Sequence, residues 1–320
     1  AFSFTGAYEV DRTVYAVLHD DIATIGSEAS DAIFVDGTNP GAGTMALDGG
    51  ATFSTDAAVD VTLSDMSADI TEVIMTVVSG NYTGCTWVPF DPLNPTVSYT
   101  FAAPVDQNWN TLYLKARDCS GRESGEVNDA IVMDLTAPVI NTMAINGGAA
   151  RTNNKNVSIT YTWTETWPSQ IMLSEDPGFA GASWQSHGSP VAFVLSDDQP
   201  EVKTVYMKMM DAAGNIGPVI NDDIELDITG PVITSIVVKD ASDGEEDCTD
   251  NWTVDVTVSY TDGDVKWLGV STTSGSGYTW TDVSAMTSPV TVSYTIAGGT
   301  CDAINTIYAV LWDDLSNVGP

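Results

Sequence analysis

Carboxylates recur at fixed places in this chain and are its side chains best suited to chemistry. In four segments a Thr, an aliphatic residue and a Tyr precede an Asp, and the Tyr stands five residues before it. The four residues are Asp20, Asp118, Asp211 and Asp313. Carboxylate, amide and carbonyl oxygens are the ligands that Ca²⁺ prefers, in sets of about six to eight. Each Asp is therefore either the cap of its own turn or also part of a calcium site.

The whole chain is strongly acidic. Its 320 residues contain 44 Asp and Glu against 10 Lys and Arg, for a formal net charge of −34. A surface of this charge repels nucleic acid and anionic membranes. No run of 18 apolar residues exists, which predicts that this segment does not span a membrane. The acidity favours either divalent-cation binding or tolerance of high salt.

The elements around the recurring Asp are predicted to be strands joined by hairpins. Residues alternate between apolar and polar before the Asp, as in a strand with one buried face. In the segment DAAGNIGP, which starts at Asp211, Gly214 and Asn215 tolerate the left-handed angles of a hairpin turn. An Asp-x-Thr-x-Pro segment follows three of the hairpins, and its Pro ends strand pairing. These segments are Asp36–Pro40, Asp134–Pro138 and Asp227–Pro231.

The repeat predicts an all-β chain of tandem immunoglobulin-like or fibronectin-III-like antiparallel β-sandwich domains. Residues 1–36 are expected to supply the C-terminal strands of an incomplete unit, and 37–134 and 135–227 to form complete domains. Residues 228–320 are expected to form a domain that lacks its last strand. The chain is then a window cut from a longer array. The alternative is strand exchange, in which the open last unit accepts a strand from a neighbouring subunit.

In this topology three acidic stretches are expected to meet at each of three junctions. Calcium at a junction would neutralise their repulsion and stiffen the linker. The alternative is that each Asp only caps its own turn. We rank the third junction first, because it has the most acids. The candidate ligands are Asp36, Asp65, Asp69 and Asp118 at the first junction, Asp134, Glu165, Asp211 and Asn215 at the second, and Asp227, Asp262, Asp264, Asp313 and Asn317 at the third.

The four cysteines are predicted to form two disulfide bonds. One lies within residues 37–134 and the other within residues 228–320. The pairs are Cys85 with Cys119 and Cys248 with Cys301. Disulfides indicate an oxidising, extracellular setting. The alternative is four free thiols in a cytosolic protein. Glycosylation sequons begin at Asn81, Asn156 and Asn251.

No constellation for catalysis is apparent, and we expect that the protein is not an enzyme. The chain has two His, His19 and His187, too few to support much acid–base chemistry. Three Trp recur once per unit, which favours a role in the core or between the sheets: Trp87, Trp184 and Trp280. Trp167 is expected to be more exposed and to pack at a junction. The alternative use of the nine Trp is a face that stacks on carbohydrate.

Four runs carry a resemblance to a known family: INGGAARTNNKNVSITYTWTE, SQIMLSEDPGF, SWQ and TVYMKMMDAAGNIGPVINDDIELDITGPVI. They resemble the bacterial and archaeal immunoglobulin-like repeats of large surface proteins. The match is strongest over 135–231, fair over 228–320 and weaker over 37–134, where ARDCSGRESG replaces the hairpin loop.

The resemblance specifies the fold well and the function poorly, because this fold hosts many roles. It implies a structural segment of an extracellular or cell-surface assembly, such as an S-layer, sheath, filament or stalk. The expected partners are identical subunits or neighbouring repeats, and glycans. The alternative is an adhesin, or an array of carbohydrate-binding modules in a larger secreted protein.

Overall fold

A computed structural model describes residues 3, 10–22, 25–196, 200–242, 244, 252–297 and 304–319. Within these ranges the structure consists of 24 strands and one three-residue 3-10 helix, η1 (Asp48–Gly50). None of the described segments is a helix with the length and apolar character needed to cross a membrane. The structure confirms the predicted all-β class built from antiparallel sheets.

The chain divides into two compact units. The first consists of Ala1–Ala137 with two loop segments, Glu165–Trp167 and Met210–Ile216. The second consists of Pro138–Thr164, Pro168–Met209 and Gly217–Pro320. The two loop segments supply side chains to a cluster described below, which therefore lies wholly in the first unit.

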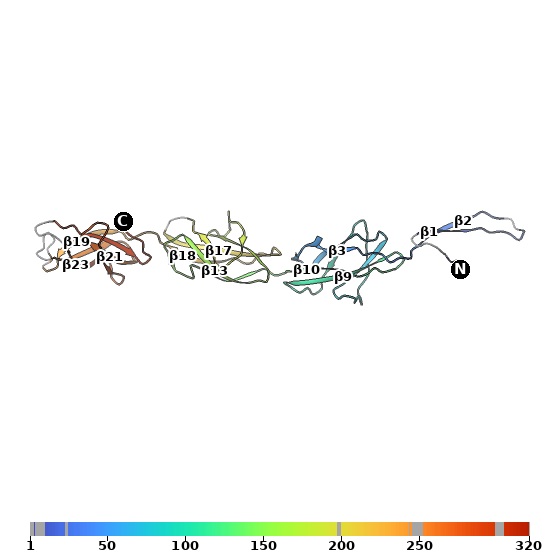
Figure 1. Ribbon diagram of the computed structural model, residues 1–320, viewed down its shortest axis with the longest axis horizontal. Helices are drawn as coiled ribbons and strands as arrows, with labels where there is room; N and C mark the ends of the chain where they lie inside the picture. The colour runs from blue at the N-terminus through green and yellow to red at the C-terminus, as the bar shows by residue number, and fades with distance from the viewer. Residues whose placement is uncertain are drawn as a thin grey trace. The chain divides into compact units, whose positions relative to one another are not determined.

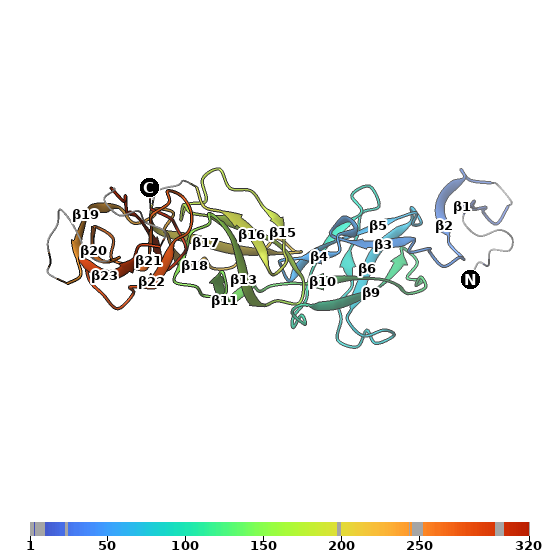
Figure 2. The ribbon, with the colours of Figure 1, turned by 60° about the vertical axis from the view of Figure 1, so that its left-hand side comes forward.

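The first unit starts with a hairpin of β1 (Val10–Ala16) and β2 (Ala29–Val35), and a two-sheet sandwich follows. The larger sheet has the order β4 (Phe53–Ser54), β10 (Val127–Met133), β9 (Asn108–Asp118), β6 (Ile70–Thr76) and β7 (Val88–Pro89). The smaller sheet has the order β3 (Thr44–Leu47), β5 (Ala58–Ser64) and β8 (Thr96–Thr100). In Figure 2, the labels β3 and β5 mark the smaller sheet, and β4, β6, β9 and β10 mark the larger one.

The second sandwich repeats this arrangement. Its larger sheet has the order β12 (Arg151–Thr152), β18 (Ile220–Leu226), β17 (Glu201–Asp211), β14 (Pro168–Ser174) and β15 (Gln185–Ser186). Its smaller sheet has the order β11 (Val139–Ile145), β13 (Asn156–Thr164) and β16 (Val191–Val194). Figure 1 shows β17 and β18, which pair antiparallel, together with β13.

The third sandwich has two three-stranded sheets among the described residues. One has the order β22 (Thr279–Asp282), β21 (Val265–Ser271) and β24 (Tyr308–Asp313). The other has the order β19 (Ile233–Asp240), β20 (Thr253–Tyr260) and β23 (Val290–Thr295). Here β24 takes the place that β9 and β17 have in the other two sandwiches.

Three separate hydrophobic cores follow from strand alternation. In β17, Val205, Met207 and Met209 are fully buried, while Tyr206 and Lys208 on the other face are half-buried, as the pattern predicts. The cores run from Ala42 to Met133, from Ile140 to Leu226 and from Val254 to Leu311. Each core falls inside one of the ranges predicted for the three domains, whose boundaries themselves remain predictions.

Strand ends place the acidic residues. The strands β9, β17 and β24 end at the recurring hairpin Asp, and β2, β10 and β18 end one residue before the Asp of the Asp-x-Thr-x-Pro segment. The glycine after each of the last two hairpins lies close to the following linker. A Cβ on Gly217 would lie 1.9 Å from the carbonyl oxygen of Pro138, and one on Gly319 would lie 2.1 Å from that of Pro231. Only glycine therefore fits at these two positions.

Candidate metal centres

Three groups of three carboxylates come together, and in each group one oxygen per residue lies within 4.8 Å of the others. The first cluster is Asp36, Asp69 and Asp118; the second is Asp134, Glu165 and Asp211; the third is Asp227, Asp264 and Asp313. Each combines a linker Asp, an acid that precedes a strand of the larger sheet, and a hairpin Asp. These are the three kinds of segment that the sequence predicts to meet.

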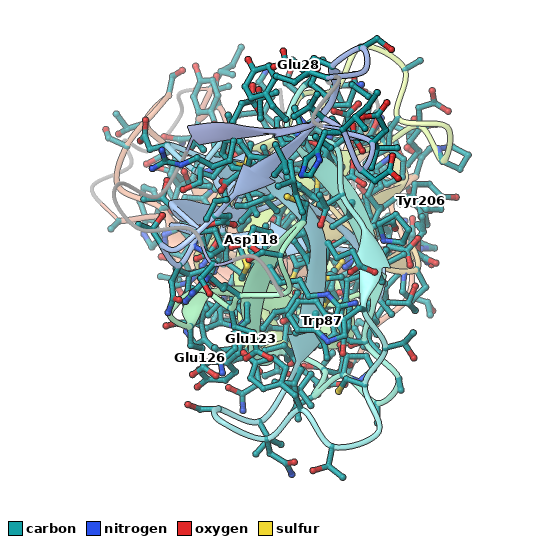
Figure 3. The ribbon with its side chains drawn as sticks, turned by 90° about the vertical axis from the view of Figure 1, so that its right-hand side faces the viewer. Glu28, Trp87, Asp118, Glu123, Glu126 and Tyr206 are labelled. Carbon is teal, nitrogen blue, oxygen red and sulfur yellow. The ribbon has the colours of Figure 1, made fainter. Side chains whose placement is uncertain are left out.

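The hairpin Asp caps its own turn with one oxygen. Oδ1 of Asp211 accepts hydrogen bonds from the amides of Gly214 at 2.8 Å and Asn215 at 2.9 Å. Oδ1 of Asp118, which Figure 3 labels, accepts from the amides of Ser120 and Arg122. In both residues Oδ2 is buried and has no hydrogen-bond partner. The turn cap therefore leaves one carboxylate oxygen of Asp118 and one of Asp211 available to their clusters.

Asp134 is the most isolated carboxylate of the second cluster. Its exposed fraction is 0%, and neither of its oxygens has a partner in hydrogen-bond geometry. Burial, followed by repulsion from Asp211, Glu165 and Asp106, raises the pKa of this carboxyl to about 6, and the Thr136 amide offsets part of the rise. A buried carboxylate without a partner is costly, so the site favours a proton or a cation beside Asp134.

Glu165 is held in place from two sides. Its Oε1 accepts from the Trp167 amide at 2.8 Å, and its Oε2 accepts from Nε2 of Gln107 at 3.0 Å. The Trp167 ring contacts Phe53 edge to face, with 5.7 Å between ring centroids. The predicted packing role of Trp167 is thus present. The sequence did not predict the contact of Gln107 with Glu165. Gln107 has a left-handed backbone (φ 52), and no local sequence motif indicates this conformation.

The third cluster contains a protein cation. The Arg151 guanidinium forms ion pairs with Asp227 at 2.6 Å, with Asp314 at 2.9 Å, with Glu225 at 3.4 Å and with Asp264 at short range. The third junction was ranked as the best metal site because it has the most acidic residues. The sequence did not indicate that Arg151 lies among them.

Asp262 and Asp264 share a hydrogen bond beside the third cluster. Burial and this hydrogen bond raise the pKa of Asp262 to about 6. Burial opposes ionisation of Asp264, but the hydrogen bond from Asp262 and the Arg151 guanidinium outweigh it and lower the pKa of Asp264. Asp264 is therefore the ionised partner of Arg151, and Asp262 is the carboxyl of the pair that keeps a proton more readily.

Three other predicted ligands have different positions or roles. Asp65 is exposed, has a left-handed backbone (φ 55) and lies outside the first cluster, because the loop turns there before it reaches Asp69. The side-chain amides of Asn215 and Asn317 donate to the backbone carbonyls of Asp134 and Asp227, both at 2.9 Å. A carbonyl oxygen can only accept, so these Nδ2 groups hold the linker backbone, and a ligand role for the side-chain oxygen Oδ1 of Asn215 and Asn317 stays a prediction.

The predicted bond between Cys85 and Cys119 is wrong, since both are free thiols. Cys119 follows Asp118, which pairs with Ile70 at the start of β6, whereas Cys85 lies beyond the level of Val73, which pairs with Val88. The seven residues of β6 span roughly 20 Å, and a disulfide needs Cα atoms within about 7 Å. Cys248, Cys301 and the sequon residue Asn251 lie outside the described residues, while Asn81 and Asn156 are exposed.

The expectation that the recurring Trp residues lie in the core or between the sheets is also wrong. Trp280 pairs with Gly269, whose neighbours Leu268 and Val270 point inward, so both lie on the outer face of their sheet. The Arg117 guanidinium lies 4.4 Å from the centre of the Trp87 ring, and the Lys208 ammonium lies 5.5 Å from that of Trp184. Trp87 is labelled in Figure 3. These side chains lie on the outer faces of their sheets.

No protein-family model and no curated protein matches the chain. The solved structures that are similar to the chain include three with low identity and low TM-score. The FN1–FN3 domains of chicken CNTN1 are 14% identical, with 88% of this chain and 96% of theirs covered and a TM-score of 0.32. A tetra-tandem repeat from the extending region of a large adhesion protein is 18% identical, with 98% and 80% covered and a TM-score of 0.30. The fibronectin(III)-like modules of Clostridium thermocellum CbhA are 12% identical, with 57% and 94% covered and a TM-score of 0.35.

Proposed function

We propose that this chain is a non-catalytic structural segment of a repeat protein at the cell surface or outside the cell, such as part of an S-layer, sheath, filament or stalk. Calcium bound at one or more of the carboxylate clusters stiffens the linkers between its sandwiches. The observation that carries the proposal is Asp134, which is fully buried, has no hydrogen-bond partner and lies beside Glu165 and Asp211.

The chemistry of the second cluster favours a hard divalent cation. Three carboxylates this close repel one another, and burial removes the water that would screen them. Their oxygens, together with backbone carbonyls of the loops, are the donors that Ca²⁺ takes in flexible sets of about six to eight. The side chains of the cluster include neither thiolate nor imidazole, the donors preferred by zinc and copper.

The linker beside Asp134 is where such an ion acts. Asp106 accepts hydrogen bonds from the Leu135 amide at 2.7 Å and from the Thr136 hydroxyl at 2.9 Å, and Asn215 holds the Asp134 carbonyl. A cation bound by Asp134, Glu165 and Asp211 would link the linker to two loops of the following sandwich. Glu165 is more than 30 residues and Asp211 more than 70 residues after Asp134. Identical subunits or neighbouring repeats are the partners of such a stiffened segment.

Thermal unfolding in calcium and in chelator, at fixed ionic strength, tests the proposal. A ligand at a hundred times its dissociation constant should raise the free energy of unfolding by about 2.7 kcal/mol. We expect this gain in wild type and its loss in Asp211→Ala. A shift no larger than the one from sodium chloride of matched ionic strength would show that the carboxylates only cap turns, and would assign the acidity to salt tolerance.

A second candidate function is carbohydrate binding, as in an adhesin or an accessory module. Three aromatic rings on one sheet of the third sandwich favour it. The Trp280 ring centroid lies 5.6 Å from that of Tyr278 and 4.9 Å from that of Trp312, and Trp280 is 39% exposed. Sugar rings stack on such surfaces. Binding on a glycan array that Trp280→Ala removes would support this function, and an array without binding would count against it.

A further inference from the structure

The second and third clusters differ at a backbone position that is equivalent in the two sandwiches. The short strand β4 pairs Phe53 with Val132 and Ser54 with Met133, just before Asp134. In the same way, β12 pairs Arg151 with Glu225 and Thr152 with Leu226, just before Asp227. Phe53 and Arg151 therefore occupy the same place relative to the linker Asp of their clusters.

At the third cluster this place supplies a positive charge. The guanidinium of Arg151 contacts both the linker Asp227 and the strand-preceding Asp264, two of the three cluster carboxylates. It also contacts Asp314, which follows the hairpin Asp313. A planar guanidinium with five N–H donors can satisfy several carboxylate oxygens at once. Asp313 is satisfied separately, since its Oδ2 accepts from the Asn317 side chain at 2.7 Å.

At the second cluster the same place supplies an aromatic ring. Phe53 packs against Trp167, and Trp167 stands two residues after Glu165, as Asp264 stands two residues after Asp262. Across the described part of the chain, no Lys or Arg forms an ion pair with Asp134, Glu165 or Asp211. Two oxygens of Asp134 and one of Asp211 are buried without a partner, against one oxygen in the third cluster, Oδ1 of Asp264.

We infer that the two clusters use different counter-charges: the second takes a divalent cation, and Arg151 fills the corresponding position in the third and closes it to metal. The inference rests on the proposed function for the second cluster and adds that calcium acts selectively along the chain. A carboxylate oxygen that accepts from Arg151 faces the guanidinium and is not free for an ion. The third cluster is then a fixed contact, independent of calcium.

The test counts bound ions per chain by calorimetric titration with Ca²⁺, with terbium luminescence excited through tryptophan as a second readout, since Trp167 adjoins the second cluster. We expect Asp134→Asn to lower the count by one ion relative to wild type and Asp227→Asn to leave it unchanged. We expect Arg151→Gln to raise the count by one ion, and Asp227→Asn in that background to remove the added ion. Near-UV circular dichroism checks the fold of each variant.

Arg117→Gln is the matched control, because Arg117 pairs with Glu72 and the Trp87 ring and does not contact a cluster. This variant should keep the wild-type count. If Asp227→Asn removes an ion from wild type, or if folded Arg151→Gln gains none, the inference is overturned while the proposed function stands. If wild type binds no calcium, both are overturned. Asp227→Asn in wild type decides the matter even if Arg151→Gln fails to fold.

Discussion

The second and third carboxylate clusters share a backbone frame and differ in the charge that balances them. In both, a hairpin Asp caps its turn with Oδ1, and an Asn four residues further on holds the linker carbonyl at 2.9 Å. The third cluster contains Arg151, and the second leaves Asp134 buried without a partner. The comparison teaches that one backbone frame can hold side chains of different electrostatic effect at equivalent positions, Phe53 in one sandwich and Arg151 in the next.

The largest expected effect comes from removing the protein cation. Arg151→Ala leaves Asp227 and Asp264 close together and without a counter-charge, and breaking a partly buried ion pair in this way typically costs about 3 kcal/mol. Chemical denaturation without divalent ions should show this loss. Added calcium should restore part of it, because the opened cluster then resembles the second one. An unchanged stability would mean that the four ion pairs of Arg151 contribute nothing.

A change of opposite sign is expected when the same substitution is made at the two linker positions. In chelator, Asp134→Asn should stabilise the chain by about 2 kcal/mol, since it removes a buried charge that costs free energy. Asp227→Asn should destabilise it, since it removes a partner of Arg151. In calcium, Asp134→Asn should lose the gain that the ion gives to wild type.

Urea denaturation of both variants, with and without calcium, measures this contrast. If both variants change the stability in the same direction in chelator, the comparison fails, because the two carboxylates would then have equivalent surroundings.

The smallest expected effect is on pH dependence. Burial beside other carboxylates raises the folded-state pKa of Asp134 from its ordinary value to about 6, so the folded state binds a proton more tightly than the unfolded state. Stability without metal should therefore rise as pH falls, by about 1 kcal/mol between pH 7 and pH 5 for this group. The difference between wild type and Asp134→Asn isolates it, and equal slopes for the two would contradict the assignment.

Local sequence patterns predicted the strands and the acidic stretches that meet. They did not predict the contacts between residues far apart in the sequence. Strand alternation and the recurring Asp are read within a few residues, so the sheets and the three groups of acidic stretches were accessible from the sequence. The contact of Arg151 with Asp227 joins residues 76 positions apart, and no spacing rule indicates it. The Cys85 and Cys119 prediction failed for the same reason, since it needed the register of β6 with its neighbours. The recurring Trp was misplaced because recurrence alone does not say which face of a sheet it occupies.

The hydrogen bond from the hairpin Asn to the preceding linker has a consequence for biosynthesis. Asn215 and the Asp134 carbonyl are 81 residues apart, and Asn317 and the Asp227 carbonyl are 90 residues apart. At about 5–20 residues per second, a ribosome needs roughly 4–18 seconds to make that interval. During this time the linker has emerged, but the loop that holds it does not yet exist. Each of these two contacts can therefore form only after most of the next sandwich has been made, and a chain arrested in translation carries an unfinished cluster near its growing end.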